Sequence, residues 1–229
     1  MKKVLYVATV LSHICQFHLP YLKMFQEKGY EVQVAAHDNL AEKNGLQLKY
    51  VDKHFEIPFQ RSPFSRKNIT SYKQLKKILD YEQYDLIVCN TPVGGMITRL
   101  AAKKARKNGT KVVYIAHGFH FYKGAPKKNW LLYYPIEKYL AKHCDTVVTI
   151  VNEDYVFADK KFKTNIVFPA GDDLSFWSVV SGIRCGRGGD HPYHASVPKG
   201  YSGGRCGYCD HRNGKRFFHP GFRYDHLLR

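Results

Sequence analysis

The sequence of 229 residues predicts an α/β fold in which helices cover both faces of a parallel β-sheet. Short apolar segments alternate regularly with segments of helical periodicity, and most of the apolar segments are nearly continuous. No internal repeat exists beyond this alternation, which is typical of a parallel sheet built from strand–helix units. The expected strands lie at 4–9, 31–36, within 49–58, and at 85–89, 111–116, 145–150 and 165–168.

The expected helices show an apolar face or a terminating residue. After the first strand, Ile14, Phe17 and Phe25 recur at helical spacing, and Gly29 ends that helix. Gly109 is expected as the C-terminal cap of another helix, and Pro135 as a kink inside a third. The remaining expected helices cover 68–81, 94–108, 128–142 and 152–161.

Charge and hydropathy limit the function classes. The net charge is +17, from 36 Lys and Arg against 19 Asp and Glu, which favours nucleic acid, an anionic membrane or a phosphorylated ligand as partner. No run reaches the roughly 20 apolar residues of a membrane span. The N-terminus has the lysines of a signal peptide, but Ser12 and His13 interrupt its apolar run and no cleavage site follows. We therefore expect a cytoplasmic protein whose six cysteines are free thiols or ligands.

The composition changes near residue 170. Residues 1–170 contain 23 Lys and 4 Arg, whereas residues 171–229 contain 2 Lys, 7 Arg and 11 of the 18 glycines. The latter range has no glutamate and only seven Ile, Leu or Val residues. We expect residues 1–170 to form one domain and residues 171–229 to form a disordered Gly/Arg/Cys-rich tail. Such a tail is either a genuine appendage that binds metal or nucleic acid, or the product of a frameshift. The abrupt exchange of Lys for Arg and Gly favours the frameshift.

Ligands of an open parallel sheet bind at the carboxyl ends of its strands. Three segments follow strands there: 9–18, 90–95 and 116–123. In the second, Thr91 precedes Gly94 and Gly95, which would let a ligand approach the backbone, and the following helix would offer free N–H groups to an anion. A plain turn is the alternative. Because neither the dinucleotide fingerprint nor the Walker pattern is present, NAD and P-loop chemistry are disfavoured.

Histidines concentrate in the first and third of these segments. His13 and His18 are five residues apart, so we expect them not to share one helical face, and a lone histidine is more often a hydrogen-bonded structural residue than a catalyst. His117 directly follows a strand, where its side chain would point into the crevice, and Gly118 permits a sharp turn. His120 and Lys123 are expected to meet phosphate or hydroxyl groups. The alternative is a helix-capping loop with its aromatic residues in the core.

Two further features are weaker. Lysines 73, 76 and 77, and the basic, aromatic stretch 123–142, suit an anionic membrane surface, although a solvated helix face is the more ordinary explanation. Cys206 and Cys209 form a CxxC, with Cys185 before it and His211 after it. This spacing is irregular for zinc, so the sequence disfavours a metal site in the tail.

Four segments together resemble a known family: VATVLSHICQFHLPYLKMFQEKGYEV, IPFQRSPFS, NTPVGGMITRLAA and AHGFHFYKGAPKKNWLLYYPIEKYLA. In this order and spacing, residues 1–168 resemble the N-terminal domain of bacterial family-4-like glycosyltransferases from capsule and exopolysaccharide clusters. The resemblance implies one half of a GT-B architecture, in which two Rossmann-like domains face each other across a cleft. It also implies retaining transfer from a nucleotide-sugar donor to a lipid-linked or oligosaccharide acceptor, with no metal and no cofactor.

The resemblance also assigns residues. His117 matches the catalytic histidine beside the donor sugar, and Gly94 and Gly95 match glycines that face the cleft. The loop with Thr9, His13 and His18 matches the substrate loop after the first strand. We expect Thr91, Gly118, His120 and Lys123 to bind substrate as well. The implied location is cytoplasmic, with peripheral contact at the inner face of the membrane, and no nucleic acid is expected as partner.

The sequence departs from the family in three places. No glutamate follows residue 170, so the paired donor-binding glutamates of the second domain are missing, and residues 169–176 keep only a trace of the usual turn. Leu11 occupies a position where a polar residue is expected. We therefore expect this chain to be inactive alone. The alternatives are a non-enzymatic basic module that binds nucleic acid or a membrane, and a sugar-nucleotide epimerase, which shares the two-domain layout.

Overall fold

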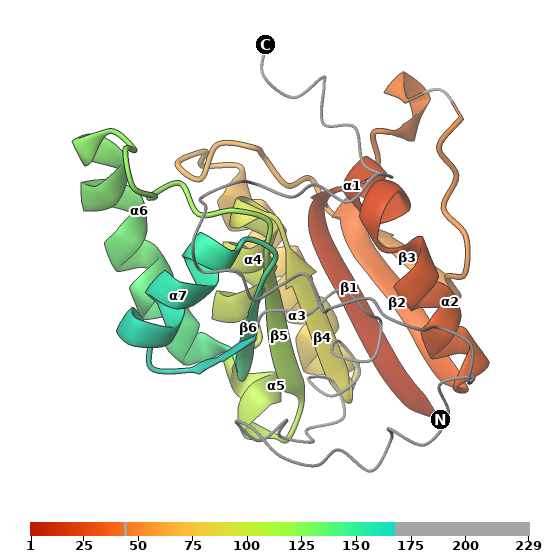
Figure 1. Cartoon of the computed structure of the whole chain (residues 1–229). Coiled ribbons are helices and arrows are strands. Elements are labelled where there is room, and N and C mark those ends of the chain that lie inside the picture. The colour runs from red at the N-terminus through yellow and green to blue at the C-terminus, as the bar shows by residue number, and fades with distance from the viewer. Residues whose placement is uncertain (44, 168–229) are drawn as a thin grey trace, which may run out of the picture. The chain divides into compact units, whose positions relative to one another are not determined.

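The computed structural model describes residues 1–43 and 45–167. The predicted tail, its CxxC pair and the boundary at residue 170 lie outside the described residues. Figure 1 shows a central sheet with helices on both sides, which confirms the predicted fold class. Among the described residues, no helix is long and apolar enough to cross a membrane.

Seven parallel strands form the sheet, in the order β3-β2-β1-β4-β5-β6-β7. The chain first builds outward from β1 in one direction and then restarts on its other side, where Val4 pairs with Leu86. The change of direction therefore lies between β1 and β4, at the carboxyl edge that is uppermost in Figure 1. The strands are β1 (Lys2–Val10), β2 (Tyr30–His37), β3 (Lys53–Glu56), β4 (Leu86–Asn90), β5 (Lys111–Ala116), β6 (Thr146–Thr149) and β7 (Asn165–Val167).

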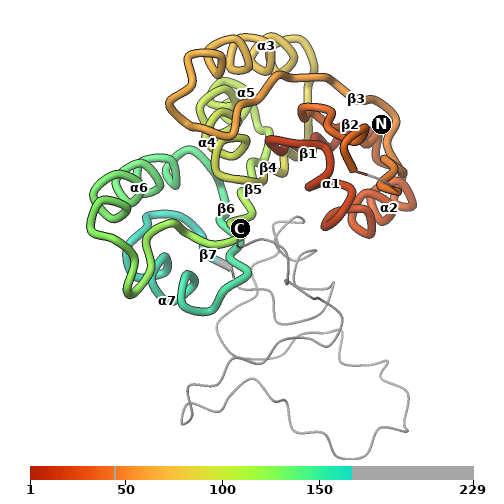
Figure 2. The backbone as a smooth tube through the Cα atoms, turned by 90° about the horizontal axis from the view of Figure 1, so that it is seen from above, coloured from red at the N-terminus to blue at the C-terminus, as the bar shows by residue number. Residues whose placement is uncertain are grey.

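Each face of the sheet has its own hydrophobic core. In β1, Val4 and Tyr6 enter one core, and Leu5 and Val7 enter the other, because successive side chains of a strand point to opposite faces. Figure 2 shows α1 (Leu11–Phe17) and α2 (Leu19–Glu27) on one side of the strands. The other core packs against α3 (Asn68–Tyr81), α4 (Pro92–Ala101), α6 (Lys127–Leu140) and α7 (Asn152–Lys161).

The helices differ from the predicted ones in two places. The first expected helix is divided into α1 and α2 at His18, because Pro20 stands in the first turn of α2, where its missing N–H does no harm. The helix expected at 94–108 is divided at Ala102 into α4 and α5 (Lys103–Lys107), and Gly109 follows α5 with a φ of 104°. Two short 3-10 turns, η1 (Leu40–Glu42) and η2 (Ala141–His143), complete the described elements.

Candidate functional site

Three histidines from two distant segments meet at the carboxyl edge of the sheet. His13 comes from α1, His18 from the junction between α1 and α2, and His117 directly follows β5. The Nε2 atoms of His13 and His117 lie 3.2 Å apart. Ring nitrogens of all three lie within 4.8 Å of one another. We call this set the histidine cluster.

As expected, His13 and His18 do not share one helical face, yet their ring centroids are only 5.4 Å apart. On one continuous helix, five residues correspond to a rotation of roughly 140°. Here the backbone leaves the helix at His18, with φ −121° and ψ −4°, before α2 begins. The break turns the His18 ring back toward His13 and His117.

Aromatic side chains enclose the cluster. The Phe17 ring lies 4.9 Å from His13 and 5.6 Å from His117, measured between centroids. Tyr6 lies 5.7 Å from His18, and both ring nitrogens of His18 are buried without a hydrogen-bond partner among the described residues. Phe17 and Tyr6 were not identified from the sequence, because each fits an ordinary apolar position of a helix or strand.

Burial keeps the histidine cluster uncharged. It lowers the pKa of His117 to about 4, and burial together with the charge of His117 lowers the pKa of His13 to about 3. The pKa of His18 also lies well below its usual value, first because of burial and then because of its two neighbours. Near neutral pH, one of the two facing Nε2 atoms therefore donates a hydrogen and the other accepts it.

Thr9 and Thr91 form a second contact at this edge. The Thr9 amide donates to Thr91 Oγ1 at 3.0 Å, and the two hydroxyl oxygens are 2.7 Å apart. Thr91 has a φ of 63°, a backbone conformation that is unusual for a β-branched residue. The bonds to Thr9 hold this conformation, together with a hydrogen bond that the Thr91 hydroxyl donates to the Asn90 carbonyl. The predicted proximity of the segments after β1 and β4 is thus present.

The expected free N–H groups of α4 are largely occupied. Pro92 has no N–H, the Gly94 amide donates to Thr9 Oγ1 at 3.2 Å, and the Gly95 amide donates to the Thr91 carbonyl at 2.8 Å. The Gly94 amide is therefore not free for an anion, and binding of an anion at this helix N-terminus stays a prediction.

Close packing explains why glycine stands at positions 94 and 95. A Cβ atom at Gly94 would lie 2.8 Å from Thr91 Oγ1 and 2.9 Å from the Thr9 amide nitrogen, and one at Gly95 would overlap the Tyr114 ring. Both residues are buried. Their expected contact with a ligand stays a prediction.

The loop after β5 divides between core and surface. Phe119 and Phe121 are buried and stacked 4.9 Å apart, as the helix-capping alternative predicts, and the Phe119 amide donates to the Asp154 carboxylate at 2.9 Å. Asp154 of α7 was missed, although an acidic residue in the first turn of a helix is a usable signal. Gly118 takes the predicted sharp turn with a φ of 129°.

The exposed part of this loop lies outside the histidine cluster. His120 is exposed and stacks on Tyr133 of α6 at 4.6 Å, and Lys123 is exposed. No contact among the described residues brings either of them to the cluster. Leu11, where the resemblance predicted a polar residue, is buried in the core beside α1.

Comparison with known proteins identifies a family. Residues 3–151 match the model of the family described as glycosyl transferase 4-like. The chain is 54% identical over 157 residues to a protein of Bacillus subtilis (strain 168) named "Putative glycosyltransferase EpsD". That match covers 69% of this chain and 40% of the relative, so the chain spans less than half the length of the relative.

A solved structure supports the fold. A UDP-N-acetylglucosamine 2-epimerase superposes with a TM-score of 0.51 over 73% of this chain and 47% of that protein. The two sequences are 12% identical, so the similarity shows the shared Rossmann-like fold alone.

Proposed function

Because this chain belongs to the glycosyl transferase 4-like family, we propose that its described part supplies the acceptor-side half of a sugar-transferring enzyme. The donor is a nucleotide-sugar, and the acceptor is an oligosaccharide or a lipid-linked glycan. The observation that carries the proposal is the contact between His13 and His117 at the carboxyl edge of the sheet. The proposed reaction uses no bound cofactor beyond the donor itself.

In this proposal, His117 contacts the donor sugar. Its uncharged imidazole can accept a hydrogen bond from a sugar hydroxyl or donate one to it, and His13 holds the ring in place from the other side. The threonine pair fixes the neighbouring backbone between β1 and α4. His120 and Lys123 are exposed on the loop that follows His117, and we propose that they meet hydroxyl or phosphate groups of the substrate.

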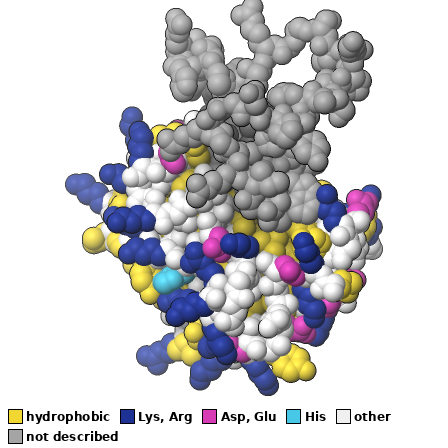
Figure 3. Space-filling model, turned by 90° about the horizontal axis from the view of Figure 1, so that it is seen from below, with side chains coloured by type: hydrophobic (Ala, Val, Ile, Leu, Met, Phe, Trp, Pro, Cys, Tyr) yellow, Lys and Arg dark blue, Asp and Glu magenta, His cyan; other side chains and the backbone are white. Residues whose placement is uncertain are grey.

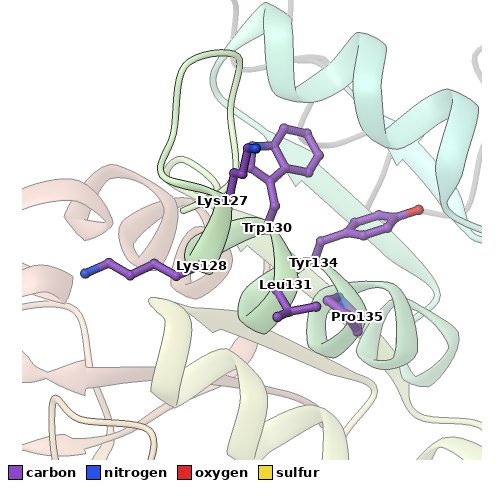
Figure 4. Close-up of a pocket in the computed structure, with 6 residues that line it drawn as sticks. All are labelled: Lys127, Lys128, Trp130, Leu131, Tyr134 and Pro135. Atoms are coloured by element: carbon purple, nitrogen blue, oxygen red, sulfur yellow. The ribbon is translucent and has the colours of Figure 1, made fainter.

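The acceptor side of the proposal involves α6. Leu131 is 81% exposed on this helix, and Trp130 and Tyr134 line a hollow beside it with Lys127 and Lys128 at its margin (Figure 4). Exposed apolar and basic side chains together suit an anionic membrane surface, where lipid-linked acceptors are found. We infer peripheral contact with the inner face of the membrane through this helix.

The alternatives have less support. Figure 3 shows Lys and Arg side chains spread over much of the visible surface, which fits a solvated protein as well as a nucleic-acid binder. Neither the family match nor the relative points to a non-enzymatic binding module. The likeness to an epimerase concerns the fold alone and does not favour epimerisation.

A chimera tests the proposed function. Residues 1–167 of this chain replace the matching part of the Bacillus subtilis relative, and transfer from a panel of radiolabelled nucleotide-sugars to membrane-extracted acceptors is measured. We expect transfer by the chimera, and its loss in His117→Ala but not in His54→Ala, a histidine of the distant strand β3. A folded chimera that transfers nothing under conditions where the intact relative is active would falsify the proposal.

A further inference from the structure

The histidine cluster has the dimensions of a metal site. In a tetrahedral zinc site, nitrogen ligands about 2.0–2.1 Å from the ion lie roughly 3.4 Å from one another. The 3.2 Å between the Nε2 atoms of His13 and His117 is close to this spacing. His18 completes a set in which one ring nitrogen of each histidine lies within 4.8 Å of the other two.

His18 provides an independent observation. Its side chain is only 2% exposed, and neither ring nitrogen has a hydrogen-bond partner among the described residues. A buried polar group without a partner is costly, and native proteins usually supply a partner such as a protein group, a water or an ion. Because the His18 nitrogens lie beside those of His13 and His117, one ion could serve all three rings.

The chemistry of the ligands defines the kind of ion. Only uncharged imidazole binds a metal ion. Three nitrogen ligands without a carboxylate suit Zn²⁺, Co²⁺, Ni²⁺ or Cu²⁺, whereas Mg²⁺ and Ca²⁺ prefer oxygen. We propose that His13, His18 and His117 together bind a divalent transition metal ion of the Zn²⁺ class.

The site would oppose sugar transfer. The family resemblance implies transfer without a metal, and an ion on His117 Nε2 would replace the contact with His13 that holds the His117 ring in the proposed function. A bound ion is therefore expected to inhibit the enzyme by competing for His117. Metal binding itself requires no donor and no second domain, so it can be measured whether or not the chain is active.

Titration of the full 229-residue chain with Co²⁺ tests the site. Nitrogen ligands give tetrahedral Co²⁺ d–d absorption in the visible range, whereas cysteine ligands add an intense near-ultraviolet charge-transfer band. This difference separates the histidine cluster from any binding by Cys206 and Cys209. We expect one equivalent of Co²⁺ with the nitrogen-type spectrum, and displacement of Co²⁺ by Zn²⁺.

Variants assign the ligands. His13→Gln and His117→Gln each remove a proposed ligand. The loss of a group that only supports a ligand lowers metal affinity roughly 10–100-fold, so we expect each variant to lower the Co²⁺ affinity by at least as much. His120→Gln, an exposed histidine three residues from His117, is expected to bind as the parent does. Cys206→Ser/Cys209→Ser is expected to keep the nitrogen-type spectrum. The proposal is overturned if Co²⁺ gives no such spectrum, or if the two ligand variants retain it while their circular dichroism shows a native fold.

Discussion

The Arg99 guanidinium donates to both carboxylate oxygens of Glu137, across 2.9 and 3.2 Å, in the interior between α4 and α6. Arg99 is fully buried, its Nε donates to the Gly95 carbonyl at 3.0 Å, and its guanidinium carbon lies 3.8 Å from the centre of the Tyr114 ring. The helix that begins beside Thr91 is thereby tied to the helix that follows the His117 loop. One buried ion pair therefore connects α4 and α6, the helices that follow Thr91 and the His117 loop.

Breaking this pair is expected to destabilise the fold strongly. Glu137→Gln preserves shape but leaves the buried Arg99 charge uncompensated, which typically costs about 3–5 kcal/mol of unfolding free energy. Urea denaturation measures the change. Lys76→Ala, which removes an ion pair with Asp80 on the exposed side of α3, is the control and is expected to have little effect. Equal effects of the two substitutions would show that the Arg99–Glu137 pair contributes no more than a surface pair.

Stability is expected to fall with acidification through the histidine cluster. The folded-state pKa of His117 is about 4, below the usual value near 6.5, so between these pH values the unfolded chain binds a proton that the folded chain does not. Full stability is therefore present above about pH 6.5 and is lost progressively toward pH 4, by up to about 3 kcal/mol for this group.

Comparison with His117→Asn isolates this contribution, because the carboxylates titrate in both proteins. The unfolding free energy is measured by urea titration at intervals between pH 7.5 and 4 (about the window set by the two pKa values). We expect the parent to lose more stability than the variant across this range. Parallel curves would mean that His117 does not resist protonation in the folded protein.

Gly95→Ala is expected to destabilise the protein because its methyl group would overlap the Tyr114 ring, against which the Arg99 guanidinium is also packed. Overpacking of this kind costs about 1–3 kcal/mol. A double-mutant cycle with Tyr114→Leu, read by thermal or urea unfolding, identifies the cause. The cost of Gly95→Ala should shrink in the Tyr114→Leu background, and an unchanged cost would place the strain elsewhere, for example in the α4 backbone.

Membrane contact through α6 predicts that Leu131→Ser weakens binding to vesicles containing phosphatidylglycerol. Burying a leucine side chain is worth about 1.5–3 kcal/mol, so a loss of roughly tenfold or more in partitioning is expected by vesicle co-sedimentation. Tyr81→Ser is the matched control, because Tyr81 is 88% exposed at the end of the basic helix α3. If both substitutions reduce binding equally, the attraction is general and α6 has no special role.

The apolar strands and the helical periodicity allowed the fold to be predicted from the sequence, because both patterns are local. They also placed Thr9, Thr91 and His117 at one edge, since parallel strands end on the same side. The meeting of His13 with His18 depends on the backbone break before Pro20, which helical spacing alone does not contain.

Packing partners explain the other differences. The close approach of Gly95 to Tyr114, and the pairing of Arg99 with Glu137 across 38 residues, are tertiary contacts between separately predicted elements. The occupied amide of Gly94 likewise depends on the hydroxyl of Thr9 in β1, 85 residues away. Composition and periodicity carry no information on such pairings, so the sequence suggested a ligand where the protein supplies its own groups.

The position of β1 in the middle of the sheet also affects how the protein is made. β1 leaves the ribosome well before its partner β4, which begins only at Leu86. At about 5–20 residues per second, the β4-pairing edge of β1 waits roughly 4–16 s for that strand. During this interval an apolar strand has one unpaired edge, which is the state most prone to association with other chains. The β4-pairing edge of β1 is therefore the part of the sheet that stays open longest after its own synthesis.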